Sequence, residues 1–296
     1  RVNNSNTYYL KSRLIQNKST NLQLYVNYRD LQAKDSSSIS EQSLNSRLNY
    51  NQRLFNNLLS LNTSFETNSG TLPQQEFTYV EVEPGQGAYT WIDYNENGIQ
   101  ELDEFEIAQF TDEGNYIRVL LPNQIFVRTH QNRLSLTTTL NFQQWSSSEN
   151  KTKKFLSHFY NQASFLVDRK LRREGNNFNL NPFESDEQNL LALNRSTRNV
   201  FFYNRGKQRY TTSYTFLSNT SRNLLSIGFQ ENTLTSHQVN FNHKFATSWL
   251  VNILGSVGTD ESFSENFANR NFELEEERLQ PKLSYVFNEN AQFDVF

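Results

Sequence analysis

Hydrophobic and polar residues alternate along most of the chain. Between residues 131 and 142, Leu134, Leu136, Leu140 and Phe142 alternate with polar side chains. A period of two predicts a β-strand with one apolar and one polar face. The same pattern predicts strands over residues 6–16, 22–29, 43–54, 58–67, 75–82, 131–142, 159–167, 198–204, 209–217, 222–230, 239–245, 247–257, 270–276 and 279–288.

Polar clusters separate these segments and predict turns. They lie at residues 34–38, 68–70, 146–154, 172–177, 219–222 and 259–266. Helical periodicity is confined to Glu101–Phe110 and Asp186–Leu193. The chain is therefore expected to be nearly all β.

Composition narrows the architecture and the function classes. Only 35% of the 296 residues are hydrophobic, although 14% are aromatic, and the polarity comes from uncharged side chains, with 40 Asn. Such a chain cannot bury an aliphatic core on both faces of its sheets. No apolar run is long enough for a transmembrane helix, the absence of Cys excludes thiolate chemistry, and a net charge of −3 argues against a nucleic-acid partner.

Two all-β architectures fit this pattern, a soluble sandwich and an outer-membrane barrel. Long strands, few Gly and Pro, and many uncharged polar residues favour the antiparallel transmembrane β-barrel, or part of a larger one. Aromatic residues near predicted strand ends fit the interfacial girdles of such barrels; they are Tyr8, Tyr9, Tyr28, Tyr50, Trp145, Phe201, Tyr203, Tyr210 and Trp249. We expect barrel strands in residues 1–69 and 131–296, with one ordered insertion at 70–130 that contains three of the five prolines.

The insertion contains the one motif with clear chemistry. Residues 93–104 match the twelve-residue EF-hand calcium loop, in which alternate oxygens converge on a hard cation, Gly98 permits the sharp turn and the last residue offers two oxygens. The alternative is an acidic Asn-Gly turn. The flanking helices of a sensor are missing, so a structural calcium ion (Ca2+) is expected. Its ligands would be Asp93, Asn95, Asn97, Ile99 through its carbonyl, Glu101 and Glu104.

The other candidates are weaker. The four His residues are dispersed along the chain, and the run Glu273–Glu277 is better explained by a charged rim than by acid–base catalysis. Lys151–Lys154 and Arg169–Arg173 fit either lipid phosphates or, preferably, a solvated hairpin end. No nucleophile elbow, Walker loop or zinc-protease motif occurs, so we expect no enzyme activity.

The segment Gly85–Glu106 resembles a signature of large outer-membrane and surface proteins of Bacteroidota, with the pattern G-x-G-x-Y-x-W-I-D-Y-N-x-N-G-I-x-E-L-D-E-F-E. Asn115–Val119 with Phe126–Thr129, Asn181–Phe183 and Asn199–Arg205 are similar to the same group. The resemblance implies a two-membrane envelope and a β-barrel in the outer membrane. Proteins of this group are usually much longer, so the chain is expected to be part of one.

These observations lead to three functional hypotheses. The first is a structural or accessory outer-membrane subunit of an envelope assembly that serves protein secretion, barrel biogenesis or nutrient uptake. Its partners would be outer-membrane lipid and other outer-membrane or periplasmic proteins. The alternatives are a passive pore, and an outer-membrane enzyme that acts on lipid or glycan through Glu273 and Glu275–Glu277.

Overall fold

The computed structural model describes residues 3–33, 41–184, 188–207, 209–225, 228–246, 248–265, 268–288 and 291–296. The protein is all-β, as the alternating pattern predicts, with 71% of the described residues in strands. The one α-helix among the described residues is α1 (Lys151–Leu156). No helix in these ranges is long and apolar enough to span a membrane.

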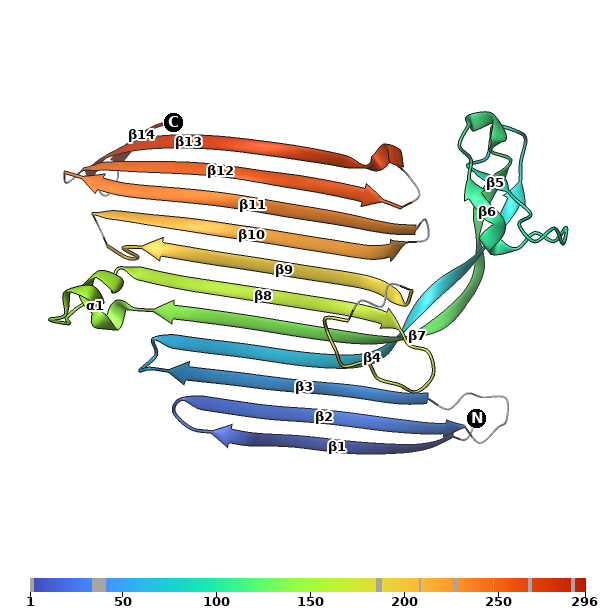
Figure 1. Ribbon diagram of the computed structural model, residues 1–296, viewed down its shortest axis with the longest axis horizontal. Helices are drawn as coiled ribbons and strands as arrows, with labels where there is room; N and C mark the ends of the chain where they lie inside the picture. The colour runs from blue at the N-terminus through green and yellow to red at the C-terminus, as the bar shows by residue number, and fades with distance from the viewer. Residues whose placement is uncertain are drawn as a thin grey trace. The chain divides into compact units, whose positions relative to one another are not determined.

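Twelve strands form one antiparallel sheet (Figure 1). Nearly every strand pairs with its neighbours in the sequence, and the single departure is that β4 pairs with β7. The strands are β1 (Asn3–Gln16), β2 (Thr20–Ala33), β3 (Glu41–Leu54), β4 (Leu59–Glu81), β7 (Tyr116–Asn141), β8 (Phe159–Arg172), β9 (Leu190–Tyr203), β10 (Tyr210–Leu225), β11 (Gly228–Phe245), β12 (Trp249–Ser264), β13 (Phe272–Asn288) and β14 (Ala291–Val295).

The remaining elements are short. Between β4 and β7 lie two strands and two 3-10 turns, which are β5 (Tyr89–Trp91), η1 (Leu102–Glu104), β6 (Phe105–Ile107) and η2 (Thr111–Glu113). Two further turns, η3 (Gln143–Trp145) and η4 (Ala268–Arg270), connect strands elsewhere.

The chain divides into two compact units. The first, which we call the sheet unit, comprises Arg1–Ser69 and His130–Phe296. The second, which we call the insertion, comprises Gly70–Thr129 and contains residues 70–81 of β4, residues 116–129 of β7 and everything between them. Each unit is described by itself below.

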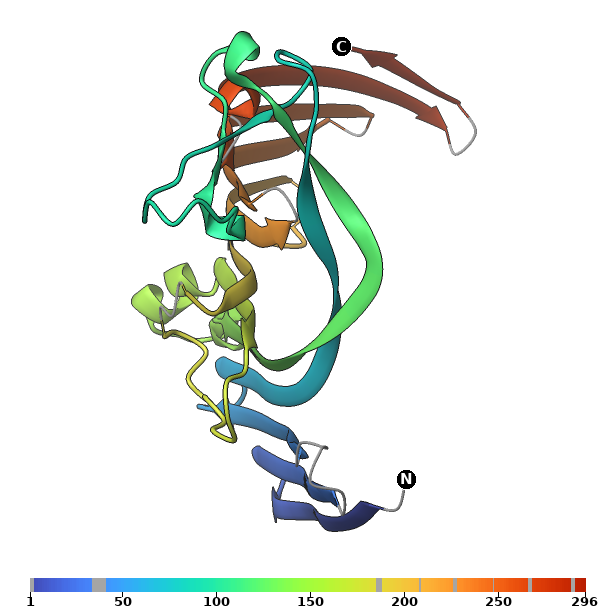
Figure 2. The ribbon, with the colours of Figure 1, turned by 90° about the vertical axis from the view of Figure 1, so that its right-hand side faces the viewer.

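The sheet is open in the part of the chain that the structure describes. Its order begins at β1 and ends at β14, and no pairing joins these two strands. Figure 2 shows the strands of the sheet unit following a curve that does not close. The large antiparallel sheet is therefore established, whereas the closed barrel expected from the sequence is not observed.

Several turns expected from polar clusters lie inside strands. Residues 68–70 belong to β4 and residues 219–222 to β10. The two strands expected at 270–276 and 279–288 are one strand, β13, which begins at Phe272. In β10 the side chain of Asn219 accepts a hydrogen bond from Ser196 Oγ on β9 at 2.6 Å. Both faces of β10 are polar around residues 219–222. A polar cluster in the sequence therefore does not indicate a turn there. The predicted turn at 34–38 lies outside the described residues.

The helices expected from periodicity are also absent. Residues 101–110 form one 3-10 turn followed by β6, because Phe105 and Ile107 pair with β5 through the strand register Trp91↔Phe105 and Tyr89↔Ile107. Of residues 186–193, 186 and 187 lie outside the described residues, and 190–193 begin β9.

Candidate functional site

The insertion is organised around aromatic rings. The Tyr79 ring stacks on Phe105 with centroids 4.1 Å apart, and Tyr89 and Tyr116 pack edge-on against Tyr79 and Phe105, each pair with centroids 5.0 Å apart. The Tyr116 hydroxyl accepts a hydrogen bond from Gln100 Nε2 at 2.8 Å, which satisfies its polar end. Packed aromatic pairs add about 0.5–1.5 kcal/mol each beyond their buried area, so this cluster gives a small unit a fixed core.

Gly87 lets two backbone segments approach each other within the insertion. A Cβ at this position would lie 2.4 Å from the Tyr116 nitrogen and 2.6 Å from the Tyr116 oxygen. The Ala88 N–H donates to that same Tyr116 oxygen at 3.0 Å. Only glycine fits, because backbone atoms on the facing strand cannot move aside as a flexible side chain can. The second glycine of the signature is therefore structural.

The twelve-residue loop closes the hairpin of β5 and β6. Asp93 accepts hydrogen bonds from the Asn97 and Gly98 N–H groups at 3.2 and 2.8 Å, and Asn97 Oδ1 accepts from the Ile99 N–H at 2.6 Å. Asn95 Oδ1 accepts from the Asn97 N–H at 3.0 Å. Gly98 has φ of +70°, the left-handed region that glycine adopts without strain. The side chains at positions 1, 3 and 5 thus accept hydrogen bonds from backbone N–H groups of the loop itself.

Glu104 lies at the twelfth position and is only 2% exposed. Its Oε2 accepts hydrogen bonds from Trp91 Nε1 at 2.9 Å and from the Glu101 N–H at 3.3 Å. Its Oε1 is buried and has no hydrogen-bond partner in the described structure. A buried carboxylate oxygen without a partner is costly, and a bound cation would satisfy it.

The loop provides the oxygen donors that a calcium ion needs, but these oxygens do not converge on one point. Asp93, Glu101 and Glu104 do not come together as a three-carboxylate cluster within the described residues. Asn95 Nδ2 donates to Glu101 Oε2 at 2.8 Å, so an amide nitrogen occupies the position next to one expected ligand. Binding would require this bond to break and Glu101 to turn towards the ion, whereas the fold already holds Glu104. The loop is thus partly organised for a hard cation.

The two units differ strongly in net charge. The insertion contains eleven Asp and Glu residues and two Arg, a net charge of −9, whereas the rest of the chain contains twenty acidic and twenty-six basic residues, a net charge of +6. The net charge of −3 conceals this division. A strongly acidic unit attracts cations and basic protein surfaces.

One face of the sheet unit is apolar and remains exposed. Cross-strand partners share a face, and the registers place Phe241 opposite Ile253, and Val239 and Leu279 on either side of Gly255. Val257 is 54% exposed and Leu279 72% exposed. The side-chain bonds Thr67–His130 and Gln131–Asp168 continue the two faces across β7. On the apolar face of the N-terminal strands, the registers pair Leu10 with Val26, and Leu24 with Leu48 and Phe65. An apolar surface of this extent on a protein is normally covered.

A row of aromatic side chains borders this apolar face at one end of the strands. Neighbouring ring centroids lie 4.7–6.4 Å apart without interruption from β8 to β13. We call this row the aromatic belt; it consists of Phe159, Tyr203, Tyr210, His243, Phe245, Trp249, Tyr285 and Phe287. Tyr203, Tyr210 and Trp249 were expected from their positions near strand ends. The other members were missed because only the strand registers align them.

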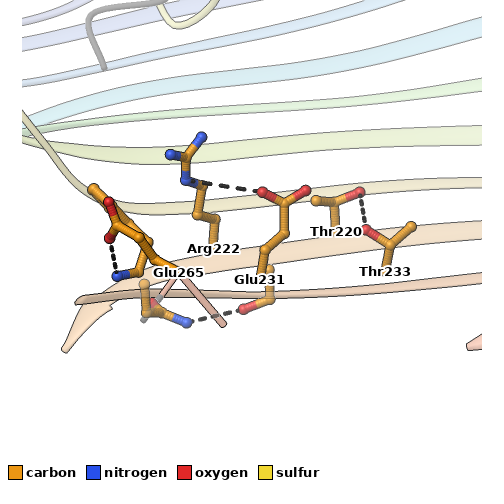
Figure 3. Close-up of polar contacts among 8 residues, drawn as sticks. Thr220, Arg222, Glu231, Thr233 and Glu265 are labelled. Carbon is orange, nitrogen blue, oxygen red and sulfur yellow. Dashed lines mark hydrogen bonds and ion pairs between the residues drawn. The ribbon is translucent and has the colours of Figure 1, made fainter. Parts of the chain in front are cut away.

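Charged residues border the same face at its other end. Arg222 pairs with Glu231 at 3.8 Å, and Thr233 Oγ1 donates to Thr220 Oγ1 at 3.5 Å. Figure 3 shows both contacts. The Glu265 carboxylate, also in Figure 3, accepts from the Phe229 N–H at 2.7 Å. Glu261 lies opposite Glu273, and Glu277 lies opposite Val257. We call this border the charged rim. The apolar residues between the aromatic belt and the charged rim form a band.

The remaining sequence candidates do not assemble into an active site. Because side chains alternate along β13, Glu273, Glu275 and Glu277 face one side while Glu276 faces the other, where it pairs with Arg278. Arg169 and Arg173 are buried rather than solvated: Arg169 Nη2 donates to the Asn181 carbonyl at 2.7 Å, and the Arg173 guanidinium lies over the Phe178 ring. The prediction of a solvated hairpin end there is wrong, because residues 178–181 cover it.

Comparison of the chain with protein-family models, curated proteins and solved structures found no match.

Proposed function

We propose that the chain is a non-enzymatic, structural or accessory component of a bacterial outer membrane. In this proposal the sheet unit contributes strands to a transmembrane β-barrel and the insertion is a docking module. The observation that carries the proposal is the apolar band, which is bordered by the aromatic belt and the charged rim. Membrane barrels carry an apolar band of this kind, with aromatic girdles at the interfaces.

The dimensions of the band support lipid as its occupant. From Trp249 to Val257 the strand advances eight residues, or about 27 Å, which is about 20 Å in height at a tilt of ~40°. A barrel band is about 25 Å tall. Strands β10–β13 have 16–18 residues, which exceeds the 9–11 that a tilted strand needs to cross the apolar layer. The excess length carries the charged rim beyond the lipid.

The opposite face supports the same proposal. Asn252 Nδ2 donates to Asn240 Oδ1 at 2.9 Å and to Asn242 Oδ1 at 2.6 Å, which forms a ladder of amides across β11 and β12. A polar lumen accommodates such side chains, whereas the packed core of a sandwich does not. In the proposal, further strands or a further protein pair with β1 and β14 to close the sheet.

In this proposal the insertion binds the partner proteins. We propose that Asp93, Asn95, Asn97, the Ile99 carbonyl, Glu101 and Glu104 hold a structural calcium ion. Its positive charge would satisfy the spare Glu104 oxygen and stiffen the β5–β6 hairpin. The net charge of −9 favours a partner with a basic surface, such as another outer-membrane or periplasmic subunit.

Three tryptophans allow a direct test of the lipid-facing band. Trp249 lies in the aromatic belt, Trp91 in the insertion and Trp145 in the connection η3. Variants that retain one tryptophan each, with Phe at the other two positions, are reconstituted into vesicles that contain brominated lipid. We expect brominated lipid to quench Trp249 strongly and Trp91 not at all, because only the first lies against the bilayer.

Aqueous iodide provides the complementary measurement. It should quench Trp91 more than Trp249 in the same vesicles. Equal access of iodide to both residues, with no quenching of Trp249 by brominated lipid, would contradict membrane insertion. For the accessory role, a barrel from native envelopes should co-purify with defined partners, and the Gly87→Val variant should lose them while remaining in the membrane.

A further inference from the structure

A hollow on the polar face of β1–β4 has the properties of a ligand site. Its volume is about 470 Å³, within the range of about 300–1,000 Å³ typical of small-molecule sites. It lies on the face opposite the apolar band, so ligand binding there does not require lipid on that band. The residues discussed below all belong to the sheet unit.

The strand registers arrange the floor of the hollow in two parallel rows. One row runs across four strands as Lys11, Tyr25, Arg47 and Glu66, each opposite the next. The second row runs beside the first as Arg13, Gln23 and Asn49, each opposite the next. Ser64, opposite Asn49, continues the row outside the hollow. Four strands span about 14 Å from the first to the last, which is much wider than a single phosphate group.

The floor offers many hydrogen-bond donors. Asn45 Oδ1 accepts from the Ser69 N–H at 3.1 Å and Asn49 Oδ1 accepts from Ser64 Oγ at 2.9 Å, which leaves both amide nitrogens as donors. Neither Lys11 nor Arg13 has a hydrogen-bond or ion-pair partner within the described part of the chain. These donors therefore favour a ligand rich in acceptor oxygens.

The net positive charge of the hollow favours an anionic ligand. Lys11, Arg13 and Arg47 contribute three positive charges, and Glu66 contributes one negative charge through its ion pair with Arg47 Nε at 2.9 Å. The pair holds the Arg47 guanidinium in place and leaves its outer N–H groups available. A carboxylate placed between Arg13 and Lys11 would form charge-assisted hydrogen bonds.

The aromatic residue of the floor selects among anions. The Tyr25 ring is held by an edge-on contact with Tyr9 at 5.6 Å, and it presents an apolar surface with a polar tip. Leu24 also lines the hollow, but its side chain belongs to the opposite face. One ring among amides suits a hydroxylated ring better than a nucleobase, which would need an apolar slot.

We infer that this hollow binds an anionic saccharide of about two sugar rings. Hydroxyl groups, which both donate and accept, match the amides of Gln23, Asn45 and Asn49, and the acidic group matches Lys11 and Arg13. The width of about 14 Å accommodates two rings along a row.

Calorimetric titration of the full chain in detergent micelles tests the inference. The probes are digalacturonate, the neutral disaccharide maltose and inorganic phosphate. Digalacturonate should bind, and Arg13→Gln and Lys11→Gln should each weaken its affinity about tenfold through the loss of one charge-assisted bond. Binding should also weaken as salt is raised.

Arg29→Gln is the matched control. Arg29 is on the same face of β2 but lies outside the hollow, where its Nε donates to Ser5 Oγ at 2.9 Å, so its removal should leave binding unchanged. Three results would overturn the inference: no binding of digalacturonate to the folded chain, equal affinity for phosphate, or affinity insensitive to Arg13→Gln and Lys11→Gln.

Discussion

In the insertion, four aromatic rings pack against one another and Tyr89 and Tyr116 are buried, whereas in the sheet unit the apolar side chains of β11–β13 remain largely exposed. The insertion also carries a net charge of −9 and the sheet unit +6. The insertion thus buries its aromatic cluster, whereas the sheet unit buries apolar side chains at β8 and β9 and leaves the apolar face of β11–β13 exposed. Perturbations should therefore affect the two units differently.

The largest effect is expected at Gly87. Gly87→Val places a side chain 2.4 Å from the Tyr116 backbone, so the insertion should lose its fold, at a cost of about 3 kcal/mol, the upper end of what overpacking typically costs. Limited proteolysis should cut within residues 70–129 and leave the strands of the sheet unit protected. Gly70→Ala is the control, since its Cβ would lie at an ordinary 3.6 Å from Thr129 Oγ1. Equal protease resistance of Gly87→Val and wild type would contradict this assignment.

The next largest effect is expected from a charge placed on the apolar face of β12, in comparison with the same charge on its polar face. Ile253→Lys places a charge within the apolar band and should destabilise the protein in lipid vesicles by about 2–4 kcal/mol. Leu254→Lys changes the adjacent residue, which lies on the opposite, polar face, and should cost much less. Urea unfolding in vesicles measures both. Equal costs would mean that lipid does not cover the apolar face.

Calcium should act on the insertion alone. Trp91 lies against Glu104, so terbium bound in the loop should luminesce when the indole is excited. Glu104→Gln should weaken terbium binding at least tenfold (about 1.4 kcal/mol), because it removes a charged ligand oxygen. Glu96→Gln is the matched control at a loop position that supplies no ligand. Luminescence that survives Glu104→Gln, or that needs Glu96, would place the ion elsewhere.

The smallest effect concerns alkaline pH. Burial, reinforced by Tyr89, raises the pKa of Tyr79 above its usual 10. A raised pKa means that the folded insertion holds this proton more tightly than the unfolded chain, so its stabilising contribution is complete below pH 10 and is lost as the pH rises further. Tyr79→Phe should flatten this decline in near-ultraviolet circular dichroism. Tyr8→Phe, in the sheet unit, should not.

The sequence predicted the presence of the strands better than the residues at which they begin and end. Alternation identified the strands because the side-chain period of a sheet is local. It divided β10 and β13 into two segments each, because outside the apolar band both faces are polar and the signal disappears. The prediction of a helix at 101–110 was wrong, because the strand pairing of Phe105 with Trp91 overrides the helical periodicity of the local sequence.

The candidate site was predictable where it depends on sequence spacing alone. The loop at 93–104 was found from its residue order, but the unpartnered Oε1 of Glu104 and the contact between Asn95 and Glu101 depend on how the hairpin folds. Three members of the aromatic belt, Tyr203, Tyr210 and Trp249, were expected near strand ends. The continuous row could not be found in advance, since Tyr210 and His243 are neighbours only in the register of β10 and β11. Summing charges over residues 70–129 would have revealed the acidic insertion.

The order of strands in the sheet also bears on how the chain folds. Almost every strand pairs with the next one in sequence, so hairpins can form one after another, each closing a short loop at small entropic cost. The pairing of β4 with β7 is the exception, because residues 82–115 separate the two strands. An insertion that folds early holds the ends of this long loop together and reduces the entropy lost when β4 meets β7. Gly87→Val should therefore slow refolding of the sheet even where it leaves the finished sheet intact.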